Sequence, residues 1–173
     1  MSTVEMKDRR IKVETYVSAT FRDAVQGISY KGLVGEFDES IELDMIWPFD
    51  NKTQSGKQMV EFALFTPRDI GLKGEGRGKK VGYPLFCREA MEIGFELCKE
   101  EDGPCLRLGY LNQPEGEDIV VVAPGIPGYA GMTTLFCVSR NGDKLVLYAD
   151  QPMLSFKENQ LCALRVPKKH RQR

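Results

Sequence analysis

The sequence predicts a mainly β fold with one inserted helix. Segments rich in β-branched and aromatic residues recur at short intervals along the 173 residues, and most of them end at Gly, Pro, Asn or Asp. A helical period of apolar residues is found in one segment alone, residues 84–100. Strands at intervals of roughly ten residues favour a distorted antiparallel β barrel or jelly roll over a parallel sheet with alternating helices.

The first expected strand covers residues 11–20, where Ile, Val, Thr and Tyr occur in close succession. Further strands are expected near residues 28–36, 41–47, 58–65, 105–111, 118–123, 132–139, 143–149 and 160–166. Asn141 and Gly142 separate two of these segments, and both residue types accept the positive φ of a tight turn. We therefore expect at least eight strands and a hairpin at Asn141 and Gly142.

The expected helix runs from Pro84 to Glu100. Its apolar side chains fall on one broad side of a helical wheel, while its charged side chains, among them Arg88 and Glu92, share the other side. Pro84 suits a first helical turn, and the Asp-Gly-Pro sequence at 102–104 is expected to stop the helix. The apolar side should therefore pack against the β core.

Charge and hydropathy limit the class of protein. The 24 Lys and Arg residues nearly balance the 25 Asp and Glu residues, whereas domains that wrap nucleic acid are usually strongly basic. No apolar run approaches the roughly 18 residues of a membrane span, and no charged-then-apolar leader is present. We expect a soluble cytoplasmic protein with no membrane partner and at most local nucleic-acid contact. One domain is expected over residues 1–166, followed by a basic flexible tail at 167–173.

Cysteine and histidine usage excludes several kinds of site. The five cysteines are an odd number without a C-x-x-C pair, which predicts buried reduced thiols and neither a disulfide framework nor a zinc site. The single histidine, His170, lies in the basic tail. Catalytic triads and metal sites that depend on histidine are therefore not expected within the fold, and no metal-ligating residues are predicted.

A glycine-rich basic segment at residues 71–82 is the first candidate site. It carries five glycines and four cationic side chains, Lys73, Arg77, Lys79 and Lys80, just ahead of the expected helix. Free backbone N–H groups and cations beside a helix N-terminus can hold phosphate. The spacing does not fit a P-loop, because Lys80 stands where that motif has Ser or Thr. A phosphate contact and a solvated loop both remain open.

Residues 123–166 resemble the dCTP deaminase and dUTPase superfamily. A Pro-Gly-aromatic-x-Gly turn at 127–131 precedes an apolar strand, an Asn-Gly turn, a second strand and a final apolar strand. Upstream, the segment 40–45 is similar to the first motif of that family, with Glu42 in place of Asp. The segments 8–11 and 62–66 resemble its opening Asp-x-x-Ile and its Phe-x-Leu-x-x-Thr strand. The resemblance is collinear over nearly the whole chain.

The resemblance implies a dUTPase-like barrel, a homotrimer and a role in the deoxynucleotide pool. A pyrimidine deoxynucleoside triphosphate, accompanied by Mg²⁺, would bind between subunits. Gly128 and Gly131 would let the backbone approach the base closely, and Tyr129 would lie against the deoxyribose. Nucleotide contacts are expected from these residues and from Ser40, Arg77, Lys79 and Arg88.

The catalytic positions depart from the family pattern. Ile126 stands where the family has an Asp before the turn, and residues 132–138 contain no acidic side chain. An acid/base would have to be Glu42, Asp44 or Glu92. The second motif is best placed at Arg88, with Arg77 and the segment 105–109 as rivals. Two hypotheses follow: a hydrolase that activates water, or a catalytically silent relative with a binding, regulatory or assembly role.

Overall fold

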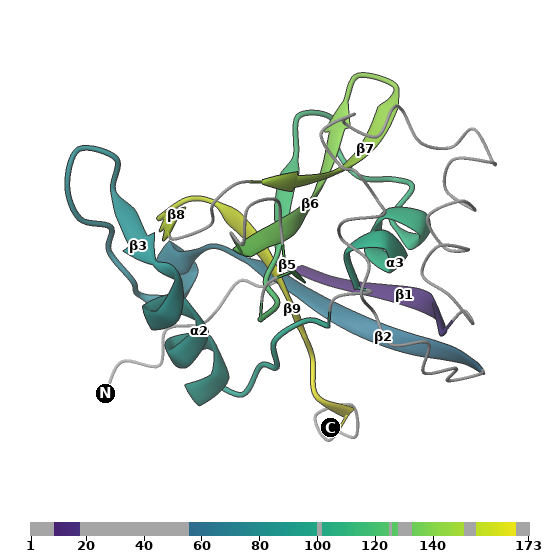
Figure 1. Cartoon of the computed structure of the whole chain (residues 1–173), viewed down its shortest axis with the longest axis horizontal. Coiled ribbons are helices and arrows are strands. Elements are labelled where there is room, and N and C mark those ends of the chain that lie inside the picture. Colours follow the sequence, from purple (N-terminus) through teal and green to yellow (C-terminus); the bar gives the residue numbers. More distant parts are fainter. Residues whose placement is uncertain are drawn as a thin grey trace.

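The computed structural model describes residues 9–17, 56–99, 102–124, 126–127, 133–150 and 155–168, and these residues are mainly β (Figure 1). The nine strands are β1 (Arg9–Val17), β2 (Gly56–Phe65), β3 (Lys80–Gly82), β4 (Asp118–Val121), β5 (Ile126–Pro127), β6 (Thr133–Asn141), β7 (Lys144–Asp150), β8 (Ser155–Lys157) and β9 (Leu161–Arg165). The helical elements are η1 (Pro67–Ile70, a 3₁₀ turn), α2 (Tyr83–Glu92) and α3 (Asp102–Gly109). In the described part of the chain, none of the helices has the length and apolar character that a membrane span requires.

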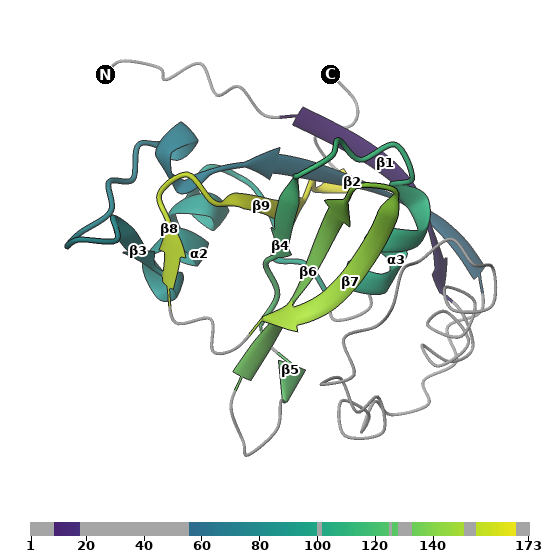
Figure 2. The same cartoon turned by 90° about the horizontal axis from the view of Figure 1, so that it is seen from above.

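Seven strands form one sheet in the order β1-β2-β9-β4-β6-β5, with β7 also paired to β6. All pairs are antiparallel except β4 and β9, which run parallel with Ile119 opposite Leu161. β3 and β8 form a separate antiparallel ribbon. Figures 1 and 2 place this ribbon and α2 at one end of the molecule, with α3 toward the other end.

The expected antiparallel barrel is therefore corrected to an open mixed sheet over the described residues. The chain leaves β4, forms the β6–β7 hairpin and the β8 strand, and returns beside β4 in the same direction as β9. A parallel pair needs such a long connection, because a tight turn joins only antiparallel neighbours.

Most of the expected strands are confirmed. Residues 11–20, 58–65, 118–123, 132–139, 143–149 and 160–166 correspond to β1, β2, β4, β6, β7 and β9. The Asn-Gly turn joins β6 to β7, and Gly142 has a φ of 61°. The expected strands at 28–36 and 41–47 lie outside the described residues.

The expected helix at 84–100 ends earlier, at Glu92. Gly94 has a φ of 103°, its N–H donates to the Met91 carbonyl, and the N–H of Phe95 donates to the Ala90 carbonyl. These two bonds form a Schellman motif, which satisfies the last carbonyls of a helix. The chain then runs extended, with Glu96 bridged to Arg165 in β9.

The expected strand at 105–111 is wrong, because this segment forms α3. The Asp102 carboxylate accepts a hydrogen bond of 2.7 Å from the Lys99 N–H and closes the turn that enters the helix. Pro104 lies in the first turn of α3, where its missing N–H costs no hydrogen bond. The Asp-Gly-Pro sequence thus starts a helix where a stop was predicted.

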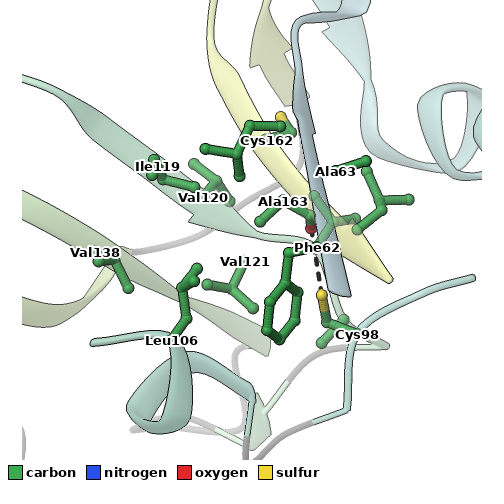
Figure 3. Close-up of a cluster of buried hydrophobic side chains, with 14 of the residues drawn as sticks. Phe62, Ala63, Cys98, Leu106, Ile119, Val120, Val121, Val138, Cys162 and Ala163 are labelled. Carbon is green, nitrogen blue, oxygen red and sulfur yellow. Dashed lines mark hydrogen bonds between the residues drawn. The ribbon is translucent and has the colours of Figure 1, made fainter. Parts of the chain in front are cut away.

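The core lies between the sheet and the helices (Figure 3). Its buried side chains include Phe62, Ala63, Leu106, Ile119, Val120, Val121, Val138, Cys162 and Ala163. All five cysteines are buried and free, which confirms the prediction of buried reduced thiols. The thiol of Cys98 donates to the Ala163 carbonyl at 3.3 Å, and burial raises the pKa of both Cys98 and Cys162.

A buried ion pair fastens α3 to the sheet. Asp102 is fully buried, and its two carboxylate oxygens accept from Arg165 Nε at 2.5 Å and from Arg165 Nη2 at 2.6 Å. These two parallel hydrogen bonds fix the orientation of the guanidinium relative to the carboxylate as well as the distance between them. The first residue of α3 is therefore held against the last residue of β9.

We expect Asp102→Asn to lower the free energy of unfolding by about 3–5 kcal/mol, because the substitution leaves the Arg165 guanidinium without this carboxylate. Urea denaturation monitored by circular dichroism measures the change. Glu89→Gln is the control, since the partly exposed Arg88–Glu89 pair should contribute about 1 kcal/mol or less. Equal losses in the two variants would contradict a special role for the buried pair.

Candidate anion-binding hairpin

Residues 73–80 form a short hairpin that leads into β3, here called the basic hairpin. The N–H of Glu75 donates to the Lys80 carbonyl at 3.0 Å, and the N–H of Lys80 donates back to the Glu75 carbonyl at 3.1 Å. A turn closed by the Lys79 N–H and the Gly76 carbonyl joins the two legs. In both views the hairpin extends away from the main sheet (Figures 1 and 2).

Two glycines are required here for different reasons. A Cβ on Gly74 would lie 2.0 Å from the carbonyl carbon and oxygen of Lys79, so the two legs approach too closely for any side chain at this position. Gly76 has a φ of 70°, which favours glycine. Lys79 has a φ of 46°, and it is the single non-glycine residue with positive φ in the described part of the chain.

Cationic side chains cover the outer face of this region. Lys73, Arg77, Lys79 and Lys80 on the hairpin are exposed, as are Arg68 on η1 and Lys157 on β8. The register of the ribbon places Lys80 directly opposite Lys157. Both lysines lie on the exposed face, because the side chains of Val81 and Phe156 point to the buried face and neighbouring residues of a strand alternate. Among the described residues, Lys73, Arg77, Lys80 and Lys157 form no ion pair.

The carboxylate of Glu158 links η1 to both legs of the hairpin. Its Oε1 accepts from Arg68 Nη2 and lies 3.7 Å from Lys79 Nζ, and its Oε2 accepts from the Gly74 N–H at 3.1 Å. The hydrogen bond from Arg68, the Gly74 N–H and the two positive charges lower the pKa of Glu158. Its main chain adds two bonds, from its N–H to the Lys79 carbonyl and from the Arg68 N–H to its carbonyl.

Part of the hairpin backbone is already bonded within the protein and does not contribute to the phosphate cradle that the glycine spacing suggested. The N–H groups of Gly74, Glu75, Lys79 and Lys80 all have acceptors within the protein. β3 also separates the hairpin from α2 along the chain, so the N-terminus of this helix does not follow the glycine-rich turn directly. The exposed cationic side chains are therefore the main candidates for holding an anion here.

The predicted site residues separate into three groups. Arg77 and Lys79 lie together on the basic hairpin, while Arg88 and Glu92 are exposed on the neighbouring α2. Arg88 donates to Glu89 at 2.9 Å. Ser40, Glu42, Gly128, Tyr129 and Gly131 lie outside the described residues.

The rival position for the second motif, segment 105–109, offers no ligand contact through Arg107. This side chain is fully buried and donates to the Gln113 side chain at 2.6 Å and to the carbonyls of Ser139 and Tyr110. Burial lowers the pKa of Arg107 to about 10, so the guanidinium stays charged at neutral pH. Its role is to join α3 to β6 and to the turn before β4.

Arg68, Lys157 and Glu158 were not found by sequence reasoning. Arg68 on η1 precedes the hairpin by a few residues, whereas the pairing of β3 with β8 brings Lys157 on β8 and Glu158 in the following turn to it. The described residues contain no group of three or more His, Cys, Asp or Glu side chains that could hold a metal ion. No protein-family model, curated protein or solved structure matches the chain.

We expect Gly74→Ala to open the hairpin, because a methyl group has no room beside the Lys79 backbone. Amide hydrogen exchange at Glu75 and Lys80 should accelerate at least about tenfold, equal to about 1.4 kcal/mol of local stability. Gly78→Ala is the matched control, since its Cβ would meet the flexible Lys80 side chain at 3.3 Å. Similar exchange rates in both variants would contradict the close approach.

Proposed function

We propose that this chain binds a phosphorylated ligand through the basic hairpin, and that this ligand is a pyrimidine deoxynucleoside triphosphate. The observation that carries the proposal is a group of exposed cations, Lys73, Arg77, Lys80 and Lys157, on one short hairpin and its partner strand. They form no ion pair with any residue in the described part of the chain. The class of nucleotide comes from the sequence resemblance to the dCTP deaminase and dUTPase superfamily, as does the proposed homotrimer.

Charge complementarity supports the phosphate end of this ligand. The whole chain has a net charge of −1, so a concentration of cations on one hairpin is a local feature. Ammonium and guanidinium groups form charge-assisted hydrogen bonds with phosphate oxygens. Because these side chains are exposed, the attraction should weaken as salt screens it.

Binding without turnover is favoured over catalysis. A general acid/base is usually tuned by burial or by a close charged neighbour. Glu92 is exposed on α2, and Ile126, at the position where the family has an Asp, carries no ionisable group. Mg²⁺ would arrive with the triphosphate, because the described carboxylates form no cluster that could hold it. We therefore propose a catalytically silent relative of the nucleotide hydrolases.

We expect dCTP or dUTP to bind the purified chain and to raise its melting temperature. Arg77→Gln or Lys80→Gln should each weaken this binding by roughly 3- to 10-fold, equal to about 0.7–1.4 kcal/mol, as measured by calorimetric titration. Lys12→Gln on β1 is the control, because it removes an exposed lysine outside the hairpin. Equal affinities in all three variants, or no binding by the parent protein, would refute the site.

We expect no product above the blank when dCTP, dUTP or dTTP is incubated with the chain and Mg²⁺. Loss of general acid/base catalysis alone removes on the order of 10²–10⁴ in rate. Turnover near one per second, within the common enzyme range, would overturn this expectation. Glu42→Gln and Glu92→Gln would then identify the acid, since only the responsible variant should lose rate while keeping affinity.

A further inference from the structure

We infer that Glu158 is a positioning residue for the proposed phosphate site, so that a negative charge inside the site strengthens the binding of a negative ligand. This inference rests on the proposed function and assigns a role to a residue outside the sequence motifs. Glu158 follows β8 directly, is 8% exposed and pairs with two cations. Glu75, the carboxylate on the hairpin itself, is exposed and has no ion pair among the described residues.

The contacts of Glu158 reach η1 and both legs of the basic hairpin. One carboxylate oxygen accepts a hydrogen bond from Arg68 on η1 and lies near Lys79 on the second leg of the hairpin. The other oxygen accepts from the N–H of Gly74 on the first leg. Long flexible cations lose conformational freedom when a ligand binds them. Glu158 restrains Arg68 and Lys79 beside the four cations of the proposed site, so the hairpin that presents those cations loses less freedom when a ligand binds.

Backbone geometry points in the same direction. Lys79 adopts a φ of 46°, which is unfavourable for a residue with a side chain, and its carbonyl accepts from the Glu158 N–H at 2.9 Å. The Glu158 residue therefore restrains both the main chain and the side chain of Lys79. Removal of the carboxylate should release Arg68 and Lys79 into many conformations and weaken the bond to Gly74.

Two substitutions with the same change of charge separate positioning from simple repulsion. Glu75→Gln and Glu158→Gln each make the region more positive by one charge, but only the second removes the ion pairs with Arg68 and Lys79. With tripolyphosphate as the probe in calorimetric titration, we expect Glu75→Gln to raise the affinity roughly two- to threefold. Glu158→Gln should lower it by about fivefold, against the direction of the charge change.

A double-mutant cycle with Arg68→Gln tests the coupling directly. In the Arg68→Gln background, Glu158→Gln should cost less affinity than in the parent protein, because one of the restrained cations is already absent. The fitted stoichiometry distinguishes a positioning role from a purely structural role. Partial unfolding would lower the fraction of protein that can bind and leave the Kd of the folded protein unchanged. An altered Kd at full stoichiometry is the expected result.

The outcomes distinguish this inference from the proposed function. If the parent protein binds neither tripolyphosphate nor nucleotide, the proposed function fails and the role of Glu158 fails with it. If the parent protein binds and both substitutions raise affinity alike, the hairpin remains the site and the positioning role is overturned. A Glu158→Gln effect confined to stoichiometry would overturn it in the same way.

Discussion

The position of β9 between β2 and β4 is the constraint on which the other elements depend. This five-residue strand is antiparallel to one neighbour and parallel to the other, so it joins the two halves of the sheet. Its last residue, Arg165, forms the buried ion pair with Asp102 at the start of α3. The turn before its first residue carries Glu158, which holds the basic hairpin. Core, helix and candidate site are thus connected through one short segment.

The sequence predicted the local elements well where the signal lies within one strand or turn. The β6–β7 hairpin follows from Asn141 and Gly142, and β1, β2, β4 and β9 follow from their β-branched residues. The two errors have a common cause. Gly94 ends α2, and the Asp-Gly-Pro sequence that follows starts α3, so a helix end was placed where a helix start lies.

The candidate site was predicted in part, because some of its residues are neighbours in sequence and others are brought in by strand pairing. Arg77 and Lys79 are neighbours in sequence and could be recognised by composition. Lys157 and Glu158 reach the hairpin through pairing of β3 with β8, and the register of distant strands cannot be derived from one sequence. The N–H groups of Gly74, Glu75, Lys79 and Lys80 are used within the protein, which the glycine spacing alone does not reveal.

The pair of Lys80 and Lys157 links ligand occupancy to the stability of the small ribbon. Two like charges directly opposite each other on neighbouring strands repel, so the three-residue pairing of β3 with β8 forms against an electrostatic cost. An anion seated between the two ammonium groups would turn this repulsion into a bridge. Relief of the repulsion would then contribute to affinity, and by thermodynamic linkage the bound anion would stabilise the pairing of β3 with β8.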